Sequence, residues 1–160
     1  THIEFGTESF CDRTLEAYGK HFTFGDVVRA SRLALDEGVY YAHFLILGGY
    51  GDTRENVRET IENSRRMEYT VMFPYAGMRI YPHTRLAELA AKEGAIGRDD
   101  DLMAPSYYIS RDFDLEEVRR AALATGKAWV FPDDPQSALA DTLRLKRNKK
   151  GPLWEYLRKP

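Results

Sequence analysis

An uninterrupted apolar run over residues 44–47 forms the centre of a predicted strand over residues 39–48. Such a run is typical of a parallel strand that is buried on both faces. The strand ends at a cluster of three glycines, Gly48, Gly49 and Gly51. The chain can turn sharply at such a cluster, and a ligand can approach its bare backbone. The cluster therefore predicts a ligand-binding turn, although a glycine cluster can also do no more than close a loop.

The neighbouring segments repeat this pattern of strand and helix. Further strands are predicted over residues 2–6 and within residues 70–82. Segments with helical spacing of apolar positions cover residues 10–19, 27–37, 53–67 and 84–93. Asp52 or Thr53 can cap the third of these helices. Residues 1–94 therefore hold three strand–helix repeats, which predict parallel strands joined by right-handed crossovers in an α/β fold.

The pattern changes beyond Gly94. Helices are predicted over residues 114–125 and about 136–147, with an apolar patch at residues 128–131 between them. The tail carries Trp154, Tyr156 and Leu157, which we expect to dock on the rest of the chain. We therefore expect two parts, a three-stranded parallel α/β domain over residues 1–96 and a helical C-terminal extension over residues 97–160.

Composition excludes several classes of protein. The chain has 160 residues and a formal net charge of -2, which argues against a nucleic-acid binder that works by bulk electrostatics. No apolar run approaches the roughly 20 residues that a membrane-spanning helix needs. The single cysteine, Cys11, excludes an internal disulfide and is typical of a reducing cytoplasm, where we expect the protein.

Few side chains suggest catalytic chemistry by themselves. The four histidines are widely spaced and match no metal-ligand pattern. His83 follows a predicted strand, so it either faces the mouth of a site or is structural. Arg79 alternates with apolar residues within a predicted strand, so it either points toward a substrate or pairs with a carboxylate. We favour the substrate role for Arg79.

Five ordered segments resemble the second half of the radical S-adenosylmethionine (SAM) barrel. They are residues 3–9, residues 15–20, Gly38, residues 45–53 and residues 79–84. Residues 104–110 resemble more narrowly the cobalamin-dependent branch, which includes iron–sulfur oxidoreductases and methyltransferases. The resemblance implies that residues 1–96 form half of a TIM barrel that binds SAM and a small-molecule substrate, with cobalamin as a possible further cofactor.

The resemblance also implies roles for individual residues. Glu8 and Ser9 would bind the ribose and amino-acid groups of SAM, and Lys20 its carboxylate. The adenine would lie against residues of the second and third strands, namely Ile46, Gly48, Ile80 and Tyr81. All of these residues except Glu8 have a structural alternative, because Ser9 can cap the following helix, Lys20 can be solvated and the four adenine residues can be core. The turn Gly49 to Asp52 and the segment Pro82 to Thr84 depart from the usual family motifs.

The largest departure is that the CxxxCxxC loop of the family does not occur in this sequence. One thiolate cannot hold a [4Fe–4S] cluster, so we expect the cluster to come from a missing N-terminal barrel half and this chain to be inactive alone. Three strands of a barrel leave two open edges and an uncovered inner face, which predicts a homo-oligomer or a covering tail. The candidates for that cover are Trp129, Phe131, Trp154 and Tyr156. The alternative is a non-enzymatic α/β module that binds a nucleotide-like ligand or a protein partner.

Overall fold

The computed structural model describes residues 2–97, 99–132 and 152–160. The first part contains β1 (His2–Glu8), α1 (Asp12–Ala17), α2 (Phe24–Asp36), β2 (Tyr40–Leu47) and α3 (Arg54–Asn63), which a 3₁₀ turn (Ser64–Arg66) follows. The second contains β3 (Val71–Ala76), β4 (Met78–Ile80), α4 (Arg85–Lys92), β5 (Ser106–Tyr108), α5 (Leu115–Ala124) and β6 (Ala128–Trp129). A 3₁₀ turn (Leu153–Tyr156) lies in the tail. The expected α/β order of elements is confirmed up to β3.

The main sheet is parallel throughout, with the strand order β1-β2-β3-β6. The three predicted strands are confirmed as parallel neighbours, but their expected number is wrong, because a fourth strand, β6, comes from the segment expected to be a helical extension. This strand has two residues, too few for any periodic pattern, and in the sequence it resembles an apolar patch. Segments after residue 96 thus share sheets with segments before it.

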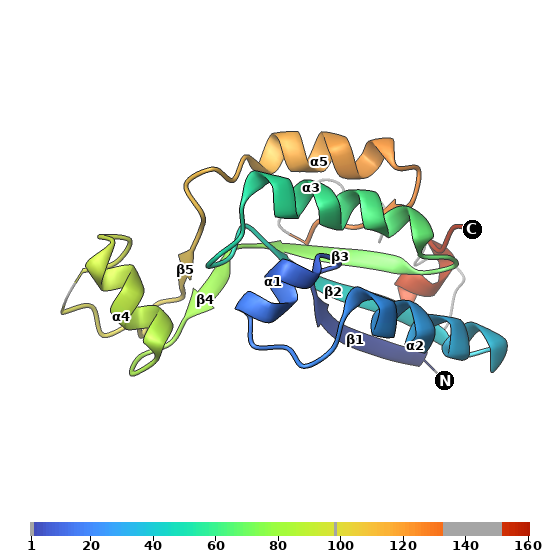
Figure 1. The fold of residues 1–160 in the computed structure, drawn as a ribbon, viewed down its shortest axis with the longest axis horizontal. Helices are drawn as coiled ribbons and strands as arrows, with labels where there is room; N and C mark the ends of the chain where they lie inside the picture. The colour runs from blue at the N-terminus through green and yellow to red at the C-terminus, as the bar shows by residue number, and fades with distance from the viewer. Residues whose placement is uncertain (1, 98, 133–151) are drawn as a thin grey trace.

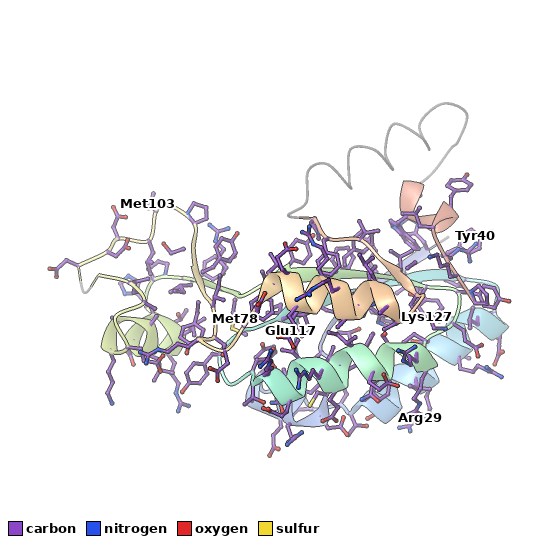
Figure 2. The ribbon with its side chains drawn as sticks, turned by 90° about the horizontal axis from the view of Figure 1, so that it is seen from above. Arg29, Tyr40, Met78, Met103, Glu117 and Lys127 are labelled. Carbon is purple, nitrogen blue, oxygen red and sulfur yellow. The ribbon has the colours of Figure 1, made fainter. Side chains whose placement is uncertain are left out.

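The predicted third strand region divides at Gly77. Its first half, β3, joins the main sheet, whereas β4 pairs with β5 in a separate antiparallel sheet. Gly77 has a φ of 75°, which favours glycine, and a Cβ there would lie 2.6 Å from the carbonyl oxygen of Tyr108. Together with α4, these two strands form a unit that projects beyond the carboxyl end of the sheet (Figure 1). Met103 marks the far end of this unit in Figure 2.

Helices α2, α3 and α5 cover one face of the main sheet (Figures 1 and 2). The core on this side joins Val27 of α2, Ile61 of α3 and Val118 of α5 to strand residues such as Leu45. Thr53 caps α3 by accepting a hydrogen bond from the backbone N–H of Asn56 at 3.2 Å. The predicted cap of this helix is confirmed.

The opposite, inner face of the sheet is built in layers of strand residues in register. Glu4, Ala42 and Val71 form a lower layer near the amino ends of the strands, Gly6, Phe44 and Phe73 form a middle layer, and Ile46 and Tyr75 lie above them. Trp154 and Leu157 of the tail pack on the lower layer. The tail therefore covers the part of this face nearest the amino ends of the strands.

The aromatic residues expected to cover the inner face divide between the two sides of the sheet. Trp154 is buried there as expected, but Trp129 and Phe131 pack in the core with the helices. Tyr156 is 42% exposed. The prediction is therefore wrong for Trp129 and Phe131. The predicted helix at about 136–147 lies outside the described residues.

Candidate functional site at the carboxyl end of the sheet

Strands β1, β2 and β3 each end at or just before a residue with positive φ. These residues are Glu8 (69°), Gly48 (74°) and Gly77 (75°). Glu8 has a side chain, so this conformation stores strain of about 1–3 kcal/mol. A register shift between Gly6 and Glu8, which leaves Thr7 as an extra residue, precedes it. The backbone of β1 is thus distorted where Glu8 leaves the sheet, and such distortions cluster at functional sites.

Glu8 and Lys20 lie together at this end of the sheet. The Lys20 Nζ atom donates to Glu8 Oε1 at 3.1 Å, and the Lys20 side chain is 29% and the Glu8 side chain 25% exposed. Lys20 is placed by the end of α1, where its backbone N–H donates to the Leu15 carbonyl at 2.9 Å. The structure therefore joins, in one partly accessible ion pair, two of the residues for which the family resemblance implies binding to SAM.

Ser9 has a different environment. It is 1% exposed, and its Oγ lies 2.8 Å from Thr60 Oγ1 and accepts a hydrogen bond from the Cys11 backbone N–H at 3.1 Å. Cys11 is the residue that precedes α1. The N-cap of α1 is Cys11, with no side-chain cap, so Ser9 does not cap this helix, and its hydrogen bond instead orders the backbone just before α1.

The glycine turn after β2 is held by Asp52. This buried carboxylate accepts hydrogen bonds from Thr14 Oγ1 at 2.6 Å and from the Gly48 backbone N–H at 2.9 Å. Burial raises the pKa of Asp52, while both hydrogen bonds favour its charged form. The sequence suggested Asp52 as a possible helix cap and missed its role in binding α1 to the turn. The position of an acidic residue directly after a glycine turn is the sequence signal that could have indicated this role.

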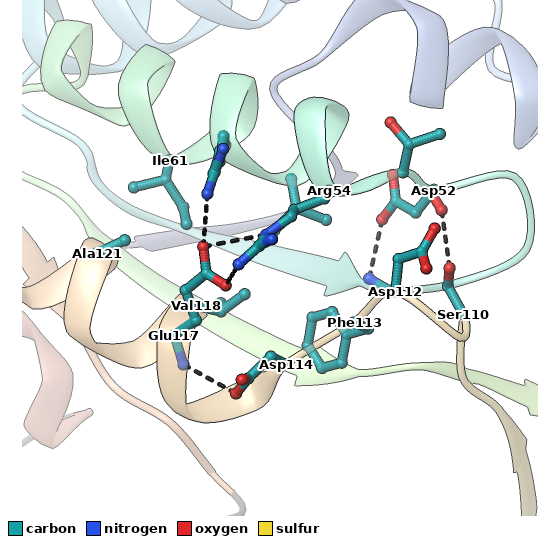
Figure 3. Close-up of a pocket in the computed structure, with 14 residues that line it drawn as sticks. Asp52, Arg54, Ile61, Ser110, Asp112, Phe113, Asp114, Glu117, Val118 and Ala121 are labelled. Carbon is teal, nitrogen blue, oxygen red and sulfur yellow. Dashed lines mark hydrogen bonds and ion pairs between the residues drawn. The ribbon is translucent and has the colours of Figure 1, made fainter.

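Gly48 is enclosed by protein. Its carbonyl accepts a hydrogen bond from the Ser110 N–H at 2.7 Å, and a Cβ on Gly48 would lie 2.4 Å from the ring of Phe113. Figure 3 shows Ser110 and Phe113 beside this turn. The bare backbone of Gly48 therefore faces Phe113. The ring of Phe113 occupies the space that an adenine against Gly48 would need.

The cavity in Figure 3 lies between α3 and α5, and charged side chains from both helices line it. Glu117 of α5 forms ion pairs with Arg54 and Arg58 of α3, the second at 2.8 Å. These hydrogen bonds lower the pKa of Glu117 to about 2. The cluster joins two helices on the covered side of the sheet, so it serves packing between helices.

The remaining predicted site residues lie in two places. Ile46 stays on the inner face of β2 and is half-buried. Ile80 is buried in a small core with Ala90 and Leu102. Arg79 is exposed and lies over the ring of Tyr81 at 4.8 Å, outside the parallel sheet.

His83, with a φ of 60°, is exposed and lines a recess beside α4. Arg79, Ile80, Tyr81 and His83 therefore belong to the projecting unit, whereas the Glu8–Lys20 pair lies at the end of β1 in the main sheet.

No family model matches the sequence. An uncharacterised methyltransferase of Pyrococcus horikoshii is 30% identical over 86 residues, which cover 51% of this chain and 19% of that protein. A radical SAM methyltransferase, TsrM of Kitasatospora setae, has a structure with cobalamin and a [4Fe–4S] cluster bound. It superposes with a TM-score of 0.63 at 17% identity, over 92% of this chain and 36% of that one.

The chain is structurally similar to radical SAM enzymes over most of its length. A second TsrM structure, with tryptophan substrate and a SAM analogue bound, gives a TM-score of 0.58 at 19% identity, over 85% and 33% of the two chains. Archaeal Elp3 of Methanocaldococcus infernus gives 0.54 at 17% identity, over 82% and 29%. This chain thus spans about a fifth of the curated relative and about a third of the solved structures.

The similarity to radical SAM enzymes raises the question of which cofactors these residues fit. Cys11 is the one cysteine of the sequence and is buried, so it does not fit a [4Fe–4S] cluster, which usually takes several thiolates. Among the described residues no group of three or more His, Cys, Asp or Glu is placed to hold a metal ion. The Glu8–Lys20 pair does fit a ligand that carries both an acceptor and a donor of charged hydrogen bonds.

In the part of the chain that the structure describes, no helix is long and apolar enough to span a membrane.

Proposed function

We propose that this chain forms part of a radical SAM enzyme, of oxidoreductase or methyltransferase type, and binds the polar groups of SAM at Glu8 and Lys20. The observation that carries the proposal is the partly accessible Glu8–Lys20 pair at the carboxyl end of β1. A carboxylate accepts hydrogen bonds from ribose hydroxyls or an ammonium, and a lysine ammonium binds a carboxylate. In parallel α/β folds, ligands bind at this end of the strands.

The fold similarity to a radical SAM methyltransferase supports this assignment. Bound SAM would supply a carbon radical once it is reductively cleaved at a cluster. That cluster would be held by residues outside these 160, because the chain has a single cysteine. The complete enzyme would act on a small molecule, with cobalamin as a possible second cofactor. Ile46, on the strand next to β1, would contribute an apolar contact to the adenine.

Calorimetric titration of SAM into the 160-residue chain tests the proposal. We expect binding to the wild-type chain and binding at least tenfold weaker in Glu8→Gln, because hydrogen bonds to charged groups contribute about 1.5–3 kcal/mol. Lys20→Met should weaken SAM binding in the same way. Glu59→Gln is the matched control, since Glu59 also forms an exposed ion pair, with Arg13 at 2.9 Å.

The outcomes separate the two functions considered. A folded wild-type chain that does not bind SAM, or a Glu8→Gln variant that binds it as tightly as wild type, would reject the proposal. Equal binding of ATP and SAM would instead favour the non-enzymatic module for nucleotide-like ligands. Circular dichroism of each variant shows whether the fold is kept.

A further inference from the structure

One ring face of Phe44 is directed toward a glycine. Phe44 and Phe73 are register partners on β2 and β3, and their rings stack at a centroid distance of 5.0 Å and an angle of 18°. Tyr75 of β3 also stacks with Phe44, at 6.2 Å. These contacts lie on the β3 side of the ring. On the β1 side, the register partner of Phe44 is Gly6, which has no side chain.

The space above Gly6 is open within the described part of the chain. Gly6 is exposed, and the one described atom within 4 Å of the position of a Cβ is Glu8 Oε1, at 4.0 Å. Gly6 is not among the residues with positive φ, so its backbone conformation does not require glycine. A glycine inside a strand costs stability relative to other residues. Gly6 borders the bulge at Thr7, which is one reason for a glycine in a strand, and the open space above it also leaves room for a ligand to approach.

The charges beside Gly6 restrict the kind of ligand. Glu8 reaches over Gly6 from the carboxyl side, with its charge partly offset by Lys20. Glu4 lies two residues away on the amino side, where its Oε1 accepts the indole N–H of Trp154 at 3.3 Å. Among the described residues, two carboxylates and one ammonium flank this space. The excess of negative charge favours a cationic group and disfavours an anionic one.

We propose that a planar aromatic ring that carries an amine binds above Gly6, stacked on Phe44, with its amine near Glu4 or Glu8. The ring site lies in the middle layer of the inner face, two residues or about 7 Å below Ile46 along the strand. A substrate ring there would lie beneath SAM held at Glu8 and Lys20. The identification of this ligand as the substrate rests on the proposed function, whereas the ring site itself does not.

Nuclear magnetic resonance titration of the ¹⁵N-labelled chain with three small probes tests the site. We expect 2-phenylethylamine to shift the amide signals of Gly6 and Phe44 and to saturate. The probe 2-cyclohexylethylamine has the same charge and a puckered ring, so it should bind about three- to tenfold more weakly, as loss of aromatic stacking requires. The anion 3-phenylpropanoate should bind more weakly than the amine of the same ring. Equal binding of the planar and puckered amines would overturn the inference.

Two pairs of variants test whether the aromatic ring of the amine binds between Gly6 and Phe44. Gly6→Val should abolish amine binding while it leaves the melting temperature unchanged or higher, because valine favours strands and meets open space. Gly25→Ala is its control, at a glycine in α2 where a Cβ makes ordinary contacts. Phe44→Leu should lose most of the amine affinity, and Phe73→Leu, on the far side of the stack, should keep it. Retained amine binding in Gly6→Val would contradict the site.

SAM titration of the same variants separates this inference from the proposed function. Gly6→Val should still bind SAM, because Glu8 and Lys20 are unchanged. Amine binding without SAM binding would reject the proposed function and keep the ring site. SAM binding without amine binding in the wild-type chain would overturn the ring site alone.

Discussion

At Gly48, both the backbone conformation and the surrounding space require glycine. Its φ is 74°, and the ring of Phe113 lies where a Cβ would be. Gly126 has nearly the same φ, 76°, with nothing within 4 Å of its Cβ position. The two glycines therefore separate the cost of a strained backbone from the cost of a steric clash.

We expect Gly126→Ala to lower the free energy of unfolding by about 1–2 kcal/mol through backbone strain alone. Gly48→Ala should cost about 1–3 kcal/mol more, because it also forces Phe113 aside. Urea denaturation of both variants measures the difference. Phe113→Ala should partly rescue Gly48→Ala, and equal costs for the two alanine substitutions would show that Phe113 does not enclose the turn.

His43 is a second residue whose surroundings have a measurable effect, in this case on the pH dependence of stability. It is fully buried, with Nδ1 2.7 Å from Thr7 Oγ1 and Nε2 3.1 Å from Ser31 Oγ. Burial lowers the pKa of His43 to about 3. The unfolded chain takes up this proton near pH 6.5 and the folded chain does not, so stability is complete above pH 6.5 and falls as the pH drops toward 3.

The wild-type chain should therefore lose about 2 kcal/mol more stability than His43→Gln between pH 7 and pH 5. Urea unfolding at several pH values measures both slopes. The carboxylates titrate in both proteins and cancel in the comparison. Parallel slopes would mean that His43 becomes protonated in the folded state.

At the scale of the elements, the sequence predicts β1 and β2 correctly but does not predict that β4 leaves the main sheet. Strands β1 and β2 and their helices follow local periodicity, and their order places Glu8 and Lys20 at one end of the sheet. The departure of β4 from the sheet was not predictable, because the alternation of apolar residues continues through Gly77. The turn there depends on pairing with β5, about 30 residues later. Arg79 therefore lies in the second sheet and Tyr81 just after β4, and neither belongs to the third parallel strand that the sequence predicts.

The tail is an element whose docking can be tested by one residue. Trp154 is 8% exposed on the lower layer of the inner face, and Lys159 forms an isolated bridge with Thr70 beside β3. Trp154→Ala should cost up to about 3–5 kcal/mol of stability, since it removes a large buried side chain. Tyr156→Ala, at a residue 42% exposed, is the control and should cost much less. Chemical denaturation monitored by circular dichroism compares them, and equal costs would contradict the docked position of Trp154.

At the scale of the whole molecule, the open edges of the sheet raise the question of association. Strand β1 is an edge strand of seven residues that carries Ile3, which is 40% exposed. An exposed, long and partly apolar edge promotes pairing with another strand. We propose that β1 pairs either with the rest of a barrel or, in the isolated chain, with a second copy.

Ile3→Lys should shift the isolated chain toward monomer, because lysine on an edge strand opposes pairing with a second strand. Leu33→Lys is the control, at an apolar residue that is 63% exposed and belongs to helix α2 rather than to the edge strand. Sedimentation velocity over a range of concentrations measures the distribution of species for each protein. A dimer that Leu33→Lys dissociates and Ile3→Lys does not would place the contact on α2. A wild-type chain that is monomeric at all concentrations would show that β1 does not pair with itself, and would leave the rest of a barrel as the proposed partner of this edge.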